Sequence, residues 1–185
     1  FAKGIRDLKQ AGCNVIVDDI TYISEPFFRD GVVAQAVDEV KAEGVSYFSA
    51  AGNFGTRSWQ GTFAPTAAPS GVVGQAHDFN PGAGIDILQS IKLFQGDYTL
   101  VFQWDDGTPG SATSSGFDIY LANSNGGALF GLNRMNIGGD AFEVLPFVVT
   151  ADSVQSNILI VRESGTGSAL LKYVVYRGQF KVNEY

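Results

Sequence analysis

The opening stretch of the chain has the hydrophobic period of an amphipathic helix. Ile5 and Leu8 are three residues apart, and Gly12 follows as a residue that suits a helix end. This spacing predicts a helix over residues 2–10. The chain begins inside this pattern without a methionine, so we expect it to be an excised fragment of a longer protein.

A strand, a helix and a second strand are predicted next. An unbroken apolar run predicts a strand over residues 14–20 that is covered on both faces. The helix is predicted over residues 32–43, with Asp30 as its N-cap and Gly44 after its end. Its apolar stripe has helical spacing and consists of Val33, Ala36, Val37 and Val40. A further strand over residues 45–50 completes a parallel β–α–β unit.

The pattern changes after this unit. Residues 56–70 lack the hydrophobic period of a helix and are rich in Thr, Ser, Gly and Pro, which predicts a loop or linker. From residue 72 onward the pattern indicates short strands separated by turn clusters, and no helix. The predicted strands cover residues 84–94, 97–104, 116–122, 141–150, 156–162 and 169–180. Strands of this length and spacing favour an antiparallel β-sandwich or jelly roll.

These elements predict a fold class of α/β plus all-β: a partial parallel α/β sheet followed by an antiparallel β-sandwich or jelly roll. We place the domains at residues 1–70, including the linker, and residues 71–185. A length of 185 residues with 45% hydrophobic and 17% charged residues indicates a globular protein. The net charge of −7 and the lack of a basic run argue against a nucleic-acid partner, and the lack of an 18-residue apolar run argues against a membrane span.

The stretch with the clearest chemical content is residues 45–55. It begins as an apolar strand and narrows to Ala50-Ala51-Gly52, whose side chains are small enough to let another molecule approach the backbone. Asn53 follows, at a position where parallel α/β sheets place their sites. An amide there can donate a hydrogen bond to negative charge that develops on a substrate oxygen. The alternative is a turn residue flanked by glycines.

The run Ser49-Ala50-Ala51-Gly52-Asn53 resembles the A-A-G-N segment of the subtilisin-like serine proteases, or subtilases. Residues 35–45 resemble the helix, glycine and strand that precede this segment in the family, and residues 12–17 resemble the strand that borders the substrate cleft. The resemblance covers residues 1–53. It implies a partial subtilisin-like sheet in which Asn53 is the oxyanion-hole donor and Gly52 contacts substrate.

The chain departs from the family where the first predicted strand ends. The best-known subtilases have a Ser-Leu-Gly type of segment there, which pairs with substrate, and this chain has Ile20-Thr21-Tyr22 in its place. Tyr22 is therefore the second candidate for substrate binding. For the preceding pair, Asp18 and Asp19, structural roles such as capping the loop are favoured; a catalytic carboxylate or a metal site is the alternative.

A subtilase also needs an Asp in a D-x-G context, a His in H-G-T and a Ser in G-T-S. The first two motifs are absent from residues 1–53, and Gly-Thr-Ser occurs nowhere in the chain. The only histidine is His77, which we expect at the surface or as a cap. We therefore predict that this polypeptide by itself has no proteolytic activity.

Other candidate residues have simpler interpretations. Cys13 is the only cysteine, so no intrachain disulfide can form, and we interpret it as a small buried hydrophobe. Trp104 is predicted to lie in the core and Trp59 to be exposed in the linker. We predict no cofactor and no metal. The alternative is a calcium ion bound by hard oxygen ligands near strand ends, for which the candidates are Asp105, Asp106 and Asp118.

Residues 100–106 and 116–121 are similar to the β-sandwich domains of pre-peptidase C-terminal type that secreted bacterial proteases often carry. In some subtilases such a domain is inserted after the oxyanion Asn. The first hypothesis is therefore a fragment of a secreted or cell-surface subtilisin-like serine endopeptidase that acts on proteins or peptides. The second is a non-catalytic β-sandwich module for adhesion or for binding carbohydrate or protein. Because half a sheet leaves an edge and apolar faces open, homodimerisation of the fragment is expected.

Overall fold

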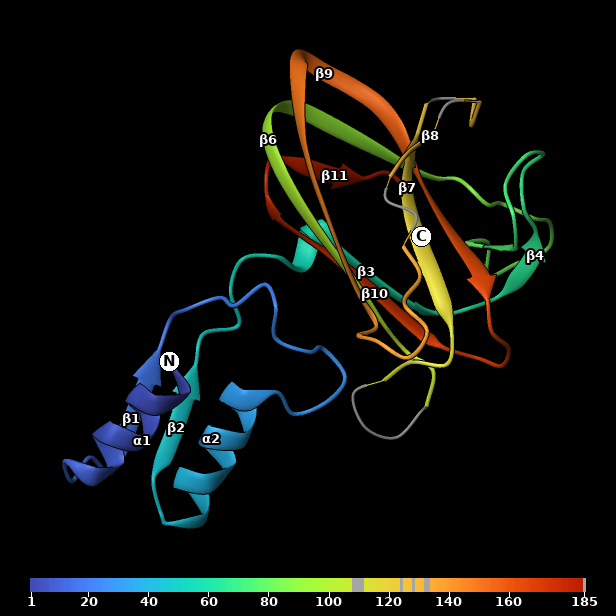
Figure 1. Cartoon of the computed structure of the whole chain (residues 1–185). Coiled ribbons are helices and arrows are strands. Elements are labelled where there is room, and N and C mark those ends of the chain that lie inside the picture. The colour runs from blue at the N-terminus through green and yellow to red at the C-terminus, as the bar shows by residue number, and fades with distance from the viewer. Residues whose placement is uncertain (108–111, 124, 128, 132–133, 185) are drawn as a thin grey trace. The chain divides into compact units, whose positions relative to one another are not determined.

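The computed structural model describes the whole chain except residues 108–111, 124, 128, 132–133 and 185. It divides into two compact units, Phe1–Asn53 and Phe54–Tyr185. Figure 1 shows both α-helices in the first unit and the large antiparallel sheet in the second. In the described part of the chain, neither helix has the length and apolar character needed to cross a membrane.

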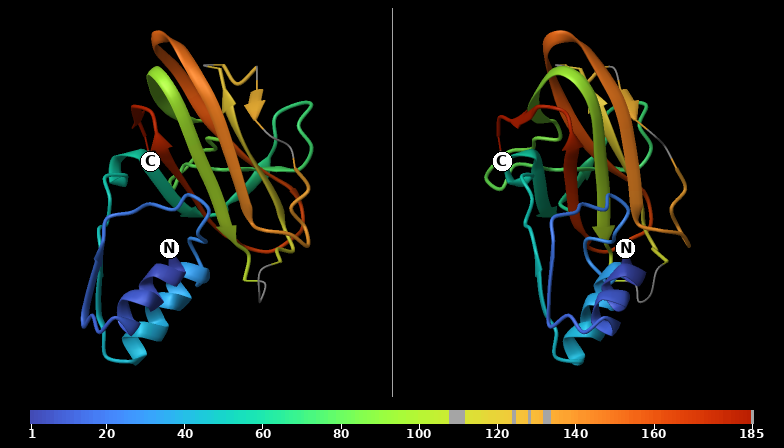
Figure 2. Two further views of the ribbon diagram at one scale, coloured as in Figure 1. Left: turned by 60° about the vertical axis from the view of Figure 1, so that its left-hand side comes forward. Right: turned by 90° about the vertical axis from the view of Figure 1, so that its left-hand side faces the viewer.

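The first unit is a small α/β assembly of two helices and two strands. Its elements are α1 (Ala2–Gln10), β1 (Val15–Asp18), α2 (Val32–Ala42) and β2 (Ser46–Ser49). The strands pair in parallel, with Val15 opposite Ser46 and Asp18 opposite Ser49. Figure 2 shows both helices on one side of the strand pair. The predicted β–α–β succession is confirmed, with strands shorter than the apolar runs suggested.

The core of this unit lies between the helices and one face of the strands. Its fully buried members are Ile5, Ile16, Ala36, Val40 and Val45. The opposite face is open, since Val15 is 58% and Val17 71% exposed. The prediction that β1 is covered on both faces was therefore wrong. An unbroken apolar run is typical of a strand that is buried on both faces, but here a single layer of helices covers only one face of β1.

The ends of α2 were predicted half correctly. Gly44 follows the helix with φ +88°, a left-handed conformation that glycine adopts without a Cβ clash. At the other end Gly31, not Asp30, is the N-cap, and no N-cap side chain closes the first turn. Glu25 Oε1 instead accepts a hydrogen bond from the Val33 N–H at 3.4 Å. The carboxylate of Glu25, in the preceding loop, thus caps the first turn of α2 in place of Asp30.

The second unit is almost entirely β-structure. After a short 3₁₀ helix at Gly55–Arg57, its strands are β3 (Ser58–Thr62), β4 (Pro65–Ala67), β5 (Gln75–His77), β6 (Gln89–Asp105), β7 (Gly116–Ala122), β8 (Leu129–Gly131), β9 (Phe142–Ser164), β10 (Leu170–Arg177) and β11 (Phe180–Val182). The main path runs β3-β10-β6-β9-β5-β4, with β11 on β6, β7 on β9 and β8 on β7. All pairs are antiparallel, and the arrangement is sandwich-like, as predicted.

The two longest strands replace four that the sequence predicted. β6 and β9 run side by side as long bent ribbons (Figure 2). The turn expected at residues 95–97 is a register shift inside β6, where Gly96 has φ +149°. Glycine permits such an irregularity without ending the strand. Local sequence cannot distinguish a bulge from a turn, because the distinction depends on the partner strand.

Residues 56–70 are not a loop, and that prediction was wrong. β3 pairs with β10, placing Trp59 opposite Tyr173, and β4 pairs with β5. These short strands have no strong alternation of their own and are strands because they extend an existing sheet. The same reason explains why β5 and β8 were not predicted.

The main core of the second unit is an aromatic-rich cluster, and a smaller cluster consists of Ala76, Leu159 and Val161. Trp104 is 3% exposed, which confirms its predicted core position. Its indole N–H donates to Thr113 Oγ1 at 3.0 Å and to the Ser115 carbonyl at 3.2 Å. Burial of this large side chain therefore leaves no unpaired polar atom on the indole.

Candidate functional site

The candidate site of the first unit lies at the carboxyl ends of β1 and β2. The parallel pairing continues one residue past the strands, because the Ala50 N–H donates to the Asp18 carbonyl at 3.1 Å. The chain then turns at Gly52, whose φ is +70°. Asn53 follows in a bend and is exposed. The predicted oxyanion donor thus comes just after the end of a parallel strand and at the surface of its own unit.

Asp18 organises the end of the strand pair. Its carboxylate accepts hydrogen bonds from the hydroxyl of Tyr47, from Ser49 Oγ at 2.9 Å and from the Ile20 N–H at 3.4 Å. Burial and the adjacent Asp18 charge both raise the pKa of Tyr47, so its hydroxyl keeps its proton. These contacts give Asp18 the structural, loop-capping role that the sequence favoured.

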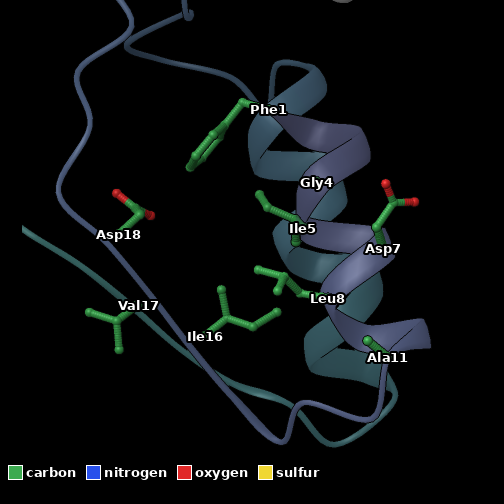
Figure 3. A pocket seen from close by; sticks show the side chains of 9 residues that line it. All are labelled: Phe1, Gly4, Ile5, Asp7, Leu8, Ala11, Ile16, Val17 and Asp18. Atoms are coloured by element: carbon green, nitrogen blue, oxygen red, sulfur yellow. The ribbon is translucent and has the colours of Figure 1, made fainter.

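A pocket of about 550 Å³ opens beside this strand end, between α1 and β1. Figure 3 shows Ile5, Leu8 and Ile16 pointing toward one another across it, with Phe1 near one end. Asp18 contributes a carboxylate at the rim. The pocket is therefore largely apolar and is lined by residues of α1 and β1.

The remaining predicted binding residues flank the strand ends. Gly52 follows β2 and Tyr22 lies in the loop after β1; both are exposed. The Tyr22 ring packs against Phe1, with ring centroids 5.2 Å apart. Gly52 and Asn53 are neighbours in the chain, whereas Tyr22 is brought to this unit's N-terminus by an aromatic contact that the sequence did not indicate.

His77 belongs to the other unit and is not at the surface, so that prediction was wrong. It is 3% exposed and lies among the rings of Trp59, Phe63 and Phe79. Its Nδ1 accepts a hydrogen bond from the Ala64 N–H at 3.0 Å. Burial lowers the pKa of His77 to about 4, with the nearby Asp78 charge acting in the opposite direction. A neutral imidazole packed in this way is a core residue.

Trp59 is part of the same aromatic cluster. It is half-buried, with ring centroids 5.1 Å from His77 and 5.1 Å from Phe79. The prediction of an exposed linker tryptophan was wrong for the same reason as the linker prediction: Trp59 belongs to β3, and β3 pairs with β10.

The carboxylates named for calcium bind protein donors. Asp105 accepts the Gly107 N–H at 2.9 Å, and Asp106 accepts Thr113 Oγ1 at 2.6 Å and the Ser114 N–H at 2.8 Å. Asp118 is buried and lies apart from these turns on β7. In the described ranges, no three His, Cys, Asp or Glu side chains are arranged to hold a metal ion.

The second unit also holds a buried carboxyl that the sequence did not single out. Glu143 is 1% exposed at the start of β9. Its Oε2 accepts a hydrogen bond from the Ile119 N–H at 3.3 Å, and its Oε1 has no partner among the described residues. The only sequence signal was a charge inside an apolar run, Phe142-Glu143-Val144-Leu145.

Comparisons with known proteins give little beyond a weak structural likeness. No family model matches the chain, and no curated protein matches it. Among solved structures, the structure of the Clostridium perfringens CspB protease is similar at a TM-score of 0.38 and 12% identity. The likeness covers 97% of this chain, and the chain spans 37% of that protein's length.

Proposed function

We propose that this chain is a segment of a secreted subtilisin-like serine endopeptidase, in which Asn53 supplies one hydrogen-bond donor to the oxyanion. The supporting observation is the position of Asn53: exposed, directly after Gly52, and just past the carboxyl end of β2 in a parallel β–α–β unit. Open α/β sheets bind their ligands at this end of their strands.

The proposal requires Asn53 to donate one hydrogen bond to a developing negative charge. During attack on a peptide bond, negative charge develops on the carbonyl oxygen, and a fixed amide N–H stabilises that charge more than it stabilises the ground state. The tight pairing of β1 and β2 through Asp18 holds the strand end from which Asn53 projects. Gly52 leaves room beside the donor for the substrate backbone.

Other catalytic groups have to come from outside this chain. The sequence has no Gly-Thr-Ser motif, and its one histidine is packed among aromatic rings. A nucleophile and a base within hydrogen-bond reach of each other are indispensable for acyl transfer. In our proposal this chain contributes the donor and a sandwich-like unit, and the substrates are proteins or peptides.

The test is peptide hydrolysis by the full-length protein that contains this chain, with and without Asn53→Ala. Loss of one oxyanion donor lowers kcat by about 10²–10³-fold in proteases of this type and changes KM little. Asn14→Ala, an exposed asparagine at the other end of the strands, is the matched control and keeps the wild-type rate. An unchanged kcat in Asn53→Ala would rule out the oxyanion role.

A non-catalytic binding module is the second candidate, favoured by the size of the β-rich unit, Phe54–Tyr185. The peptide-hydrolysis assay described for Asn53→Ala also distinguishes the two candidate functions. A module would show no hydrolysis and no labelling by a serine-directed fluorophosphonate in the full-length protein. It would also bind glycans or peptides equally well with Asn53 replaced.

A further inference from the structure

Glu143 has an unusual environment for a carboxyl group. It is 1% exposed and lies opposite Phe102 of β6, and one of its oxygens has no partner among the described residues. The other oxygen accepts the Ile119 N–H of β7 at 3.3 Å. A buried carboxylate with one long hydrogen bond is costly, whereas the neutral acid is tolerated.

The groups that face Glu143 oppose its ionisation on balance. Asp118 on β7 is 2% exposed, and Arg134 lies in the segment between β8 and β9. Burial and then the Asp118 charge raise the pKa of Glu143 to about 8, while the Ile119 N–H and Arg134 act against this shift. On the β6 side the opposing residues, Phe102 and Gln103, do not titrate.

Asp118 itself has two further titratable neighbours, Glu163 and Tyr120. Burial is the first cause that raises the pKa of Asp118, and the Glu163 charge adds to it. Burial followed by the Asp118 charge raises the pKa of Tyr120, whose hydroxyl donates to Asp118 at 3.0 Å. The cluster therefore contains three carboxyl groups, one tyrosine and one arginine, and a proton on Glu143 reduces the excess of negative charge.

Two consecutive residues of β7 hold the two ends of one segment, residues 134–143. Asp118 accepts the backbone N–H of Arg134 at 3.4 Å, and Ile119 donates its N–H to Glu143. Between these anchors Asn136 Nδ2 donates to the Asp140 and Phe142 carbonyls at 3.3 Å each. The segment thus contacts β7 through one carboxyl group at each end. Between them the Thr113 N–H donates to the Gly139 carbonyl at 3.0 Å, and the Thr113 carbonyl accepts the Gly138 N–H at 2.8 Å. The last two residues of the segment also pair with β6.

We propose that Glu143 is a proton-operated switch: the neutral side chain packs against β7, and its ionisation loosens the contact between β7 and the start of β9. Two like charges brought together in a buried site repel each other, and a buried anion draws water toward itself. Both effects are relieved when the end of the segment moves away from β7. The contact between β7 and the start of β9 therefore loosens as the pH rises and tightens as the pH falls.

The experiment uses the full chain and Glu143→Gln, which keeps an oxygen acceptor for Ile119 and cannot ionise. Between pH 6 and pH 9 we expect the unfolding equilibrium constant of the wild type to rise by more than about tenfold, and that of the variant by less than about threefold. The protection factors of the Ile119 and Arg134 amides, which are corrected for the intrinsic pH dependence of exchange, should fall with pH in the wild type alone. Infrared spectra at pH 6 should show a protonated-carboxyl band that the variant lacks.

Asp152→Asn removes an exposed carboxylate from the same strand and keeps the wild-type pH dependence. Should Glu143→Gln fail to fold, Asp118→Asn is the second variant; it lowers the pKa of Glu143 and so reduces the loss of stability at high pH. The proposal is overturned by a pH dependence that persists in Glu143→Gln, or by the absence of the infrared band. It is also overturned if calcium stabilises the wild type but not the variant, because a bound cation would then replace the proton.

Discussion

The hydroxyl of Tyr47 donates a hydrogen bond to the carboxylate of Asp18 across the parallel strand pair. Tyr47 lies opposite Ile16, and Ser49, opposite Asp18, donates to the same carboxylate at 2.9 Å. Two alternate residues of β2, Tyr47 and Ser49, are thereby hydrogen-bonded to one residue of β1. These contacts lie in the last residues of β2, after which the chain continues to Asn53.

Removal of this tie should loosen the strand ends. We expect Tyr47→Phe to lower the stability of the first unit by about 1–2 kcal/mol, because a hydrogen bond to a charged acceptor is lost in a partly exposed place. Amide hydrogen exchange of Asp18 and Ala50 reports the change directly. Tyr22→Phe, at a tyrosine that is 41% exposed, is the control and should leave the exchange rates as they are.

The buried histidine predicts acid sensitivity. The pKa of His77 is lowered to about 4 in the folded chain, against about 6.5 unfolded, so the unfolded state binds the extra proton first. The contribution of His77 to stability should therefore be complete above about pH 6.5 and fall by about 2–3 kcal/mol as the pH drops to 4. His77→Asn, which keeps an acceptor for the Ala64 N–H, should flatten this part of the profile in denaturant titrations. An identical acid limb in both proteins would show that other groups cause it.

The turn after β10 predicts a steric effect. Gly178 has φ +98°, and a Cβ at this position would overlap the ring of the buried Tyr98. Gly178→Ala should cost about 1 kcal/mol for the left-handed backbone and a further 1–3 kcal/mol for the displaced ring. Gly167 has φ +92° with nothing within 4 Å, so Gly167→Ala isolates the backbone cost. Equal losses in the two variants would contradict the overlap with Tyr98.

The open face of the first unit predicts self-association of the isolated chain. Val17 is 71% and Phe48 59% exposed, and the two lie opposite each other on β1 and β2. Light scattering of the chain should show a concentration-dependent increase in mass, because apolar surface of this kind is buried on contact. Val17→Lys should reduce the increase, and Lys3→Ala, on an exposed part of α1, should not. A mass that stays monomeric at high concentration would refute this expectation.

Local sequence was sufficient to predict those elements whose hydrophobic spacing and end signals lie within their own residues. The helical stripes of α1 and α2, the glycine that ends α2 and the parallel succession of β1 and β2 follow from spacing and from the few conformations that end a helix. The bounds of β7 were also predicted correctly, because its apolar residues form one run between two turn clusters. In the same way, the sequence indicated that Asn53 follows a strand.

Only the tertiary structure decided which residues share an environment. The placement of His77 and Trp59 in one aromatic cluster depends on β3 pairing with β10 and on β4 pairing with β5, contacts between residues far apart in the chain. The burial of Glu143 beside Asp118 depends in the same way on β7 lying against the start of β9. The hydrophobic period of a segment indicates whether that segment by itself favours a helix or a strand. Burial, pKa shifts and hydrogen-bond partners are set by the segments that come to lie next to it.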